Sequence, residues 1–316
     1  MFEAELYEVR ERVREAYRYA PVRGELARIV AETVANPGKM VRPKVMLMVA
    51  GDYPPDTRDE LLCSAAAIEA SHTASLVLDD MVDGAAMRRG APTVYANNGT
   101  DVALYVGLSI LMGAQEYVLE RGYARTADAI AHTVQVMCDG EMLQHDSRRN
   151  VDVEEKTLLA AIRGKTASLF ERACTLACQI TRKDEAYTSA MARLGECLGI
   201  MFQIRDDLLD WTASEEQAGK PVNEDFASGI YTLPAVYALS QEGYGDRLRA
   251  LAQKPTLSAE DLVVARELVL EAGGIAYAHE ILGRLAADAH TCIDAHLGGI
   301  YAEGLRVLVD LLEGRA

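Results

Sequence analysis

The sequence has little basic charge, no paired cysteine motif and a long central stretch without proline. Its 32 Lys and Arg residues are outnumbered by 48 Asp and Glu residues, so the 316-residue chain carries a formal net charge of −16. The acidic balance argues against a nucleic-acid-binding protein, which normally presents a basic surface. It does not exclude anionic substrates, because a few placed cations or bound metal ions can reverse the local potential.

The cysteines and the apolar runs indicate a protein of the cytosol. None of the cysteines forms a CxxC pair, and we expect reduced, mostly buried thiols at Cys63, Cys138, Cys174, Cys178, Cys197 and Cys292. The charged start of the chain is unlike a signal peptide. No uninterrupted apolar run reaches the about 18 residues of a membrane span. We therefore expect a cytoplasmic location and no transmembrane segment.

The absence of proline between Pro92 and Pro221 favours long helices. Apolar residues recur at helical spacing over 64–83, 102–119 and 158–180, and strict strand-like alternation is hard to find. No linker of biased composition interrupts the chain. The sequence thus predicts an all-α helical bundle in one domain, 1–316, with a motif-bearing core over about 36–240 and further helices over 256–316.

One short motif occurs twice. Asp79-Asp80-Met81-Val82-Asp83 is repeated as Asp206-Asp207-Leu208-Leu209-Asp210, in both cases after an apolar segment. Positions i and i+4 share one face of a helix, so the outer aspartates of each copy align. Carboxylates among apolar residues need cations. Oxygen ligands without His or Cys favour Mg²⁺, whose shell is completed by water and phosphate oxygens. The alternative is a pair of solvated acidic helix ends.

Several basic groups accompany these motifs. Arg88 and Arg89 precede a Gly-x-Pro turn, and Lys39 and Arg42 lie in GKMVRP. Paired arginines can offer forked donors to phosphate oxygens. Alone each cation is typical of a solvated surface, but together they indicate a site for two polyphosphate groups. Four further residues complete the candidate set: Lys165, Lys220, His72 on the stripe of Asp79, and Gln203, which either contacts substrate or supports an aspartate.

In its motifs the chain resembles the all-trans isoprenyl diphosphate synthases. The resemblance covers residues 36–240, and seven motifs carry it in order: GKMVRP (38–43), EASHTASLVLDDMVD (69–83), RRGAPT (88–93), GKTASLF (164–170), FQIRDDLLD (202–210), GKPVNED (219–225) and GIYTLP (229–234). It implies an α-helical bundle with a deep central cavity and a homodimer. We expect the two aspartate motifs to face each other across that cavity.

The resemblance also implies a role for each candidate residue. Asp79, Asp83, Asp206 and Asp210 would bind three Mg²⁺ ions, with Asp80 and Asp207 completing the motifs. Arg88, Lys165 and Lys220 would contact the allylic diphosphate. The diphosphate of isopentenyl diphosphate would be held by Lys39, Arg42, His72 and Arg89, and the reacting end of the allyl group would be lined by Thr166 and Gln203. The released diphosphate would take the final proton.

Four positions depart from the family pattern. Leu78 stands where His often precedes the first motif, and Leu108 where an Asp often follows Gly. Asn223 replaces an expected Gly, and Ile230 replaces a lysine that contacts the allylic diphosphate. Loss of that contact would weaken binding by about 1–3 kcal/mol. Two alternatives to a chain-elongating enzyme therefore stay open: a class I terpene cyclase, and a weakly active subunit of a heteromeric synthase.

The residues below the first motif predict a long product. Ser75 lies one helical turn, about 6 Å, below Asp79, with Ala74 beside it and Ser71 a turn further. In this family aromatic side chains at this level stop chain growth, whereas these three are small. We expect a product of at least twenty carbons, whose end is set by a neighbouring helix through a residue such as Tyr105 or Met112. The alternative is that small residues here only allow close helix packing.

Overall fold

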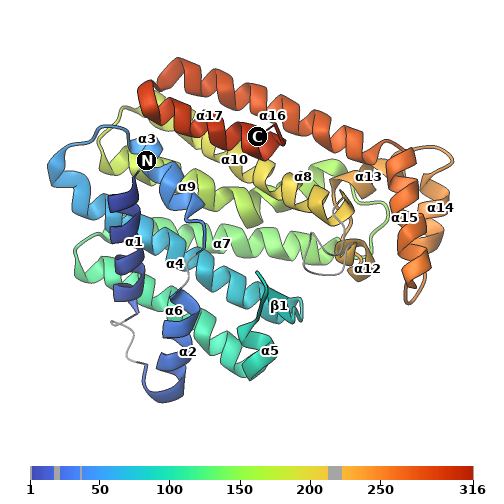
Figure 1. Ribbon diagram of the computed structural model, residues 1–316, viewed down its shortest axis with the longest axis horizontal. Coiled ribbons are helices and arrows are strands. Elements are labelled where there is room, and N and C mark those ends of the chain that lie inside the picture. The colour runs from blue at the N-terminus through green and yellow to red at the C-terminus, as the bar shows by residue number, and fades with distance from the viewer. Residues whose placement is uncertain (1, 18–21, 36–37, 213–222, 316) are drawn as a thin grey trace. The chain divides into compact units, whose positions relative to one another are not determined.

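The computed structural model describes residues 2–17, 22–35, 38–212 and 223–315, which are almost entirely helical (Figure 1). The all-α prediction is confirmed. The elements that begin before residue 125 are α1 (Glu3–Ala16), α2 (Gly24–Val34), α3 (Val41–Ala50), η1 (Pro55–Thr57), α4 (Arg58–Val82), β1 (Met87–Arg88), β2 (Ala91–Pro92), α5 (Val94–Asn98), α6 (Thr100–Glu120) and α7 (Ala124–Asp146). They are followed by α8 (Glu155–Ile162), η2 (Arg163–Ala167), α9 (Ser168–Ile180), α10 (Glu185–Thr212), α12 (Glu224–Ser228), α13 (Leu233–Ser240), α14 (Gly245–Ala252), α15 (Ala259–Glu271), α16 (Gly274–His296) and α17 (Gly299–Glu313).

The residue contacts divide the chain into two compact units. Unit 1 comprises Met1–Gln135, Leu169–Gly195 and His296–Leu305, and unit 2 comprises Val136–Ser168, Glu196–Ala295 and Arg306–Ala316. Each unit is described by itself. The single-domain expectation and the cavity shared by both aspartate motifs therefore stay predictions.

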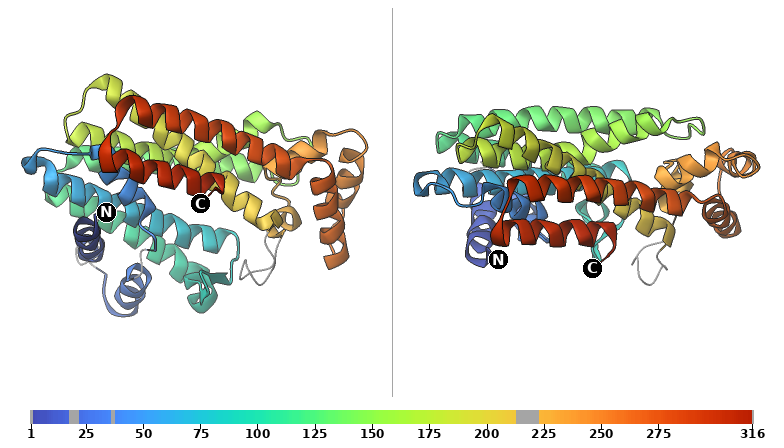
Figure 2. Two further views of the ribbon diagram at one scale, coloured as in Figure 1. Left: turned by 45° about the horizontal axis from the view of Figure 1, so that its top comes forward. Right: turned by 90° about the horizontal axis from the view of Figure 1, so that it is seen from above.

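The centre of unit 1 is formed by α4 and α6, which lie side by side in both views (Figures 1 and 2). Small residues let the two helices approach. A Cβ placed on Gly107 of α6 would lie 2.7 Å from the side chain of Leu78 and 3.5 Å from the carbonyl of Ala74. The buried face of α4 is correspondingly rich in alanine, as the spacing in the sequence predicts: Ala65, Ala66, Ala67, Ala70 and Ala74.

A short antiparallel hairpin, β1 paired with β2, follows α4. Thr93 fixes its end to the next helix, because the Thr93 hydroxyl donates to the Ala85 carbonyl at 2.7 Å and accepts from the Ala96 N–H at 3.0 Å. This is the hydrogen-bonding pattern of a helix N-cap. The hairpin carries Arg88 and Arg89 and so presents both cations beside the C-terminal end of α4.

In unit 2, glycines permit backbone contact between helices. A Cβ on Gly164 would lie 2.8 Å from Cα of Gly140 in α7, and a Cβ on Gly199 of α10 would lie 2.8 Å from Cβ of Ala167. Further along, α14 and α15 pack against each other (Figure 2). The latter helix begins with a capping box of Ser258 and Asp261.

Two helical segments in the described part of the chain are long and apolar enough to cross a membrane by length and composition. They are Pro55–Val82, whose most apolar window is 72% buried, and Thr100–Glu120, whose window is 44% buried. The core helices of a soluble bundle have the same properties. The difference in burial shows that α6 leaves much more of its apolar surface uncovered than α4 does.

Candidate active site

The first aspartate motif ends α4, and its middle carboxylate is the most buried of the three. Asp80 is 4% exposed and accepts a hydrogen bond from Nε of Arg88 at 2.7 Å. Burial raises the pKa of Asp80, an effect that the arginine opposes. Asp79 is half-buried, and Asp83 at the helix C-cap is exposed. Asp79 and Asp83 are thus one turn apart at a helix end, as predicted.

The basic residues of unit 1 gather around His72. The guanidinium of Arg89 lies against Gly38, where any Cβ would collide with it. Lys39 is the exposed residue next to that glycine. Burial lowers the pKa of His72 well below its usual range, and the nearby Arg42, Arg89 and Arg88 lower it further. Arg42, His72 and Arg89 of the predicted set are therefore brought together, with a neutral imidazole among cations, and Lys39 is placed only through its neighbour Gly38.

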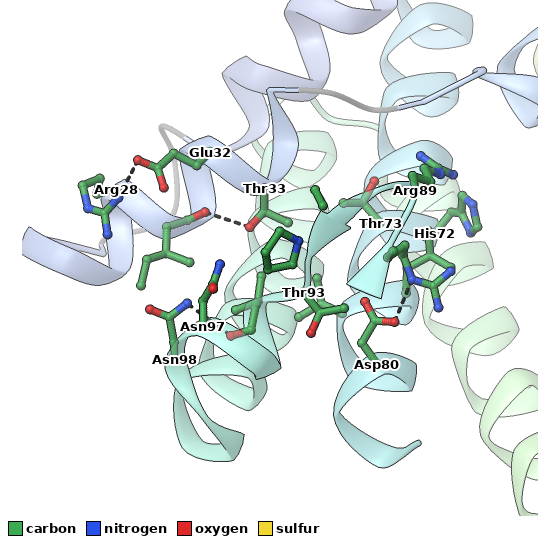
Figure 3. A pocket seen from close by; sticks show the side chains of 17 residues that line it. Arg28, Glu32, Thr33, His72, Thr73, Asp80, Arg89, Thr93, Asn97 and Asn98 are labelled. Carbon is green, nitrogen blue, oxygen red and sulfur yellow. Dashed lines mark hydrogen bonds and ion pairs between the residues drawn. The ribbon is translucent and has the colours of Figure 1, made fainter. Parts of the chain in front are cut away.

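A cavity of about 650 Å³ opens beside this group within unit 1. His72, Asp80, Arg88 and Arg89 line it, together with polar residues of α2 and α5 that the sequence analysis did not single out (Figure 3). These additional lining residues include Thr33, Asn97 and Asn98. Of the predicted cations, Arg88 and Arg89 thus border open space, whereas Arg42 is buried against Phe170.

In unit 2, a π-helical turn presents Lys165 and Thr166. The turn spans Arg163–Ala167 and separates α8 from α9. Such turns are rare and are frequent at functional sites. The ammonium group of Lys165 lies 2.8 Å from a carboxylate oxygen of Glu141 and 3.1 Å from Oε1 of Gln144, both on α7. These two polar partners hold the lysine in place.

A hydrogen-bonded chain links this turn to the second aspartate motif. The Thr166 hydroxyl donates to Oε1 of Gln203 at 2.8 Å, and Nε2 of Gln203 donates to Oδ1 of Asp207 at 2.8 Å. Gln203 thus makes the contact with an aspartate that one of its two considered roles requires, and its contact with substrate stays a prediction. The amide is held with its oxygen toward the threonine and its nitrogen toward the carboxylate.

The second motif concentrates negative charge. Asp207 is 5% exposed, and its pKa is raised well above its usual range by burial and then by Asp225, with further contributions from Asp206 and Asp210. Asp206 is exposed. A set of hard oxygen donors of like charge fits a divalent cation. Among the described residues no group of three or more His, Cys, Asp or Glu is arranged as a complete protein-built metal site.

Asn223 departs from the family pattern without changing the backbone. It has φ 61°, in the left-handed region, and it is the N-cap of α12. Glycine suits this region best and asparagine is the common substitute. The Asn223 N–H donates to the Asp210 carbonyl at 3.2 Å, which ties the turn to the second motif. The Gly-to-Asn change is therefore conformationally conservative.

The other three positions that depart from the family pattern differ in their burial and contacts. Leu78 packs against Gly107, and Leu108 is exposed on α6. Ile230 is half-buried, and its N–H bonds to the Asp225 carbonyl at 2.8 Å. Lys220 lies outside the described residues.

The three chain-length residues lie on α4. Ser71 and Ala74 are buried and Ser75 is half-buried. Both serines turn their hydroxyls to their own helix, to the carbonyls of Ala67 at 2.8 Å and of His72 at 2.9 Å. Tyr105 and Met112, suggested as residues that end the tunnel, are 56% and 55% exposed on α6. Neither side chain lies on the buried face of that helix.

Some polar residues of the site escaped the sequence analysis. Glu141 and Gln144 hold Lys165, Asp225 adds charge beside Asp207, and Glu69 lies buried on α4. For Glu141 and Gln144 the available signal was Gly140, a glycine inside a helix, which these two polar residues follow at a spacing of three residues from each other. Glu69 had a simpler signal, since it is the one acidic residue between Glu60 and Asp79.

The described part of the chain is thus an all-helical protein that carries two aspartate motifs and a group of arginines beside a cavity. The family model described as "Polyprenyl synthetase" matches residues 23–269, and the chain belongs to this family. It is 36% identical over 221 residues to heptaprenyl diphosphate synthase component 2 of Geobacillus stearothermophilus, covering 69% of this chain and 68% of that protein. It is 35% identical to solanesyl diphosphate synthase 1, chloroplastic, of Arabidopsis thaliana, covering 80% and 63%.

A solved structure agrees over the full length. The decaprenyl diphosphate synthase of Rhodobacter capsulatus superposes with a TM-score of 0.87 at 27% identity, covering 99% of this chain and 97% of that chain. The protein is thus a trans-prenyltransferase of the polyprenyl diphosphate synthase type. The family acts on isopentenyl diphosphate and an allylic diphosphate and is in general Mg²⁺-dependent.

Proposed function

We propose that this protein condenses isopentenyl diphosphate with an allylic diphosphate, in the presence of Mg²⁺, to give a trans polyprenyl diphosphate of at least twenty carbons. The observation that carries the proposal is a pair of aspartate motifs at helix positions i and i+4, on α4 and α10, together with the cations around His72. One anion site would suffice for a single-substrate cyclase. The separate basic group of unit 1 favours two diphosphate substrates.

Asp79, Asp83, Asp206 and Asp210 are the residues that would hold the metal, three ions in our proposal. Mg²⁺ held by these carboxylates would neutralise the leaving diphosphate and so stabilise the charge that develops as the allylic C–O bond breaks. Arg88, Lys165 and Lys220 contribute further positive charge to the same diphosphate. Their own partners, Asp80 and Glu141, hold the first two in place before substrate arrives.

The second substrate is held by Lys39, Arg42, His72 and Arg89. Its double bond attacks the allylic cation, a new carbon–carbon bond forms, and a proton is lost to the released diphosphate. Positioning of two bound substrates supplies much of the rate. The hydrogen-bonded pair Thr166–Gln203 lines the reacting end of the allyl group, where its fixed dipoles stabilise positive charge.

The product length follows from Ser71, Ala74 and Ser75. Their small side chains leave room for the growing chain, and both curated relatives named above are synthases of long prenyl chains. We expect Ser75→Phe to shorten the product by one or more isoprene units, whereas Ser75→Ala leaves it unchanged. Product analysis by mass spectrometry measures both. An unchanged length in the phenylalanine variant would contradict the assignment.

The exposed face of α6 supports a homodimer. Leu104, Tyr105, Leu108 and Met112 are exposed on it, and residues 102–115 contain no charged side chain. An uncharged apolar face is an unusual surface for a chain of net charge −16, and it allows two copies to meet without repulsion. A second arrangement has support of its own, because one relative is named as component 2 of a heptaprenyl diphosphate synthase. In that case α6 would contact a different protein.

One assay tests the function and separates the arrangements. Purified protein is incubated with Mg²⁺, labelled isopentenyl diphosphate and farnesyl diphosphate, and the molar mass is measured by light scattering. Elongated diphosphates from a dimer of about twice the 34.4 kDa chain mass support the proposal. A cyclic hydrocarbon with diphosphate release would indicate a cyclase instead. Turnover only after addition of a second protein would indicate a heteromeric subunit.

A further inference from the structure

Three buried polar atoms of unit 1 have no hydrogen-bond partner within the described residues. They are Oε2 of Glu69, Nε of Arg42 and the hydroxyl oxygen of Tyr17. The three residues are 2%, 6% and 7% exposed. Arg42 lies over the ring of Phe170, 4.5 Å from its centre, and makes no ion pair with Glu69 within 4.0 Å. An acid this deeply buried and incompletely hydrogen-bonded is costly and calls for a functional explanation.

We propose that Glu69 sets the charge of the isopentenyl diphosphate site: its buried carboxylate, which forms no ion pair with Arg42, opposes through space the positive charge that Arg42 and Arg89 offer to the diphosphate, and its protonation removes that opposing charge. This inference rests on the proposed function, since it takes Arg42 and Arg89 as ligands of that diphosphate. Glu69 acts through these arginines and is therefore a positioning residue, not a catalytic one.

The surroundings of Glu69 hold few other ionisable groups. Arg42 and Lys44 from α3 and Arg89 from the hairpin lower its pKa, but burial outweighs them and raises the pKa to about 7. Tyr17, after α1, is a neutral hydroxyl whose pKa Glu69 helps to raise. His72 on the same helix stays neutral. Phe170 of α9, over whose ring Arg42 lies, is apolar and fully buried.

The sign of the effect follows from this charge balance. At pH 6 Glu69 is mostly protonated, and Arg42 and Arg89 offer their full charge to the diphosphate. At pH 8 Glu69 is mostly ionised, and part of that charge is cancelled. Because binding of an anion stabilises the protonated acid, the protein must take up a proton when isopentenyl diphosphate binds near pH 7.

The test compares Glu69→Gln with the native protein and with Glu60→Gln, the same substitution near the start of the same helix. The Michaelis constant for isopentenyl diphosphate is measured from pH 6 to pH 8.5, with saturating farnesyl diphosphate and Mg²⁺. We expect the ratio of native to Glu69→Gln values to rise by about three- to tenfold over this range, because a coupling of half to one pKa unit has this size. The Glu60→Gln ratio stays flat.

Calorimetry of the native protein gives a second readout that needs no variant. Isopentenyl diphosphate alone is titrated at pH 7 in two buffers of different ionisation enthalpy, and net proton uptake is expected. A flat ratio for Glu69→Gln, or proton release by the native protein, would overturn the inference while leaving the prenyltransferase activity intact. Absence of elongation in native protein and Glu60→Gln alike would instead refute the proposed function.

Discussion

The two copies of the aspartate motif share the pattern Asp-Asp-x-x-Asp, but their chemical surroundings differ. In the first, the buried middle residue Asp80 is paired with a cation, Arg88. In the second, the buried middle residue Asp207 is held by a neutral amide, Gln203, and faces additional carboxylates. In both copies the middle aspartate points into its own unit. The difference shows that a cation pairs with the buried aspartate in unit 1, whereas an amide holds the buried aspartate in unit 2, where Lys165 is bound by Glu141 and Gln144.

The largest effect is expected from the outer aspartates. Asp206→Asn removes a proposed metal ligand from the copy whose buried aspartate is held by an amide and not by a cation, and we expect turnover to fall by about 10²–10³-fold. Asp79→Asn should cost less, since Arg88 remains nearby. Steady-state kinetics at increasing Mg²⁺ measures both. Chelation by EDTA should abolish activity and added Mg²⁺ should restore it, and equal, metal-independent losses would remove the contrast between the copies.

The second largest effect is expected on the pH dependence of stability, through Glu69, which precedes the first aspartate motif on α4. The pKa of Glu69 is raised to about 7 from 4.5, so its protonated form stabilises the fold. That stability is fully present below about pH 4.5 and is lost as the pH rises through about 7. At pH 8, Glu69→Gln should therefore unfold at higher denaturant than the native protein, by up to about 3 kcal/mol. At pH 5 the two should be nearly equal. Equal stabilities at pH 8 would mean that the carboxylate is well compensated.

A smaller effect on stability is expected from Gln203, the amide that holds Asp207 in the way that Arg88 holds Asp80. Gln203→Leu leaves Oδ1 of Asp207 and the hydroxyl of Thr166 without their partner, which should lower the stability by about 1–3 kcal/mol. Thr166→Val removes only the outer hydrogen bond and serves as the matched comparison. Chemical denaturation measures the difference. Were both variants equally stable, the hydrogen-bonded chain would not be what supports Asp207.

The smallest effect is expected at Asn223. Asn223→Gly should change stability by only a few tenths of a kcal/mol, because glycine adopts the same left-handed conformation freely. Asn223→Ala should cost about 1 kcal/mol. Thermal unfolding of the two variants separates backbone conformation from side-chain bonding. A larger loss in the glycine variant would assign a role to the buried Asn223 amide.

Much of the fold, and the arrangement within each aspartate motif, was predictable from the spacing of residues in the sequence. Helical spacing fixed the alignment of Asp79 with Asp83 and of Asp206 with Asp210, because i and i+4 positions coincide on any α-helix. It could not reveal that Asp80 and Asp207 turn inward, since that depends on Arg88 in a hairpin and on Gln203 bonded to Thr166. Glu69 was missed because its function depends on cations from α3 and the hairpin, which are distant in sequence.

The π-helical turn at Arg163–Ala167 has a consequence for variation of this chain. Such a turn contains about one residue more than an α-helix needs, so the loss of one residue from it can be absorbed by conversion to regular helix, with no rotation by about 100° of the residues that follow. The side chains within the turn would change direction instead, and Lys165 would lose its position beside Glu141 and Gln144. Relatives of this protein that lack the extra residue should therefore keep the helix and differ in how the lysine is held.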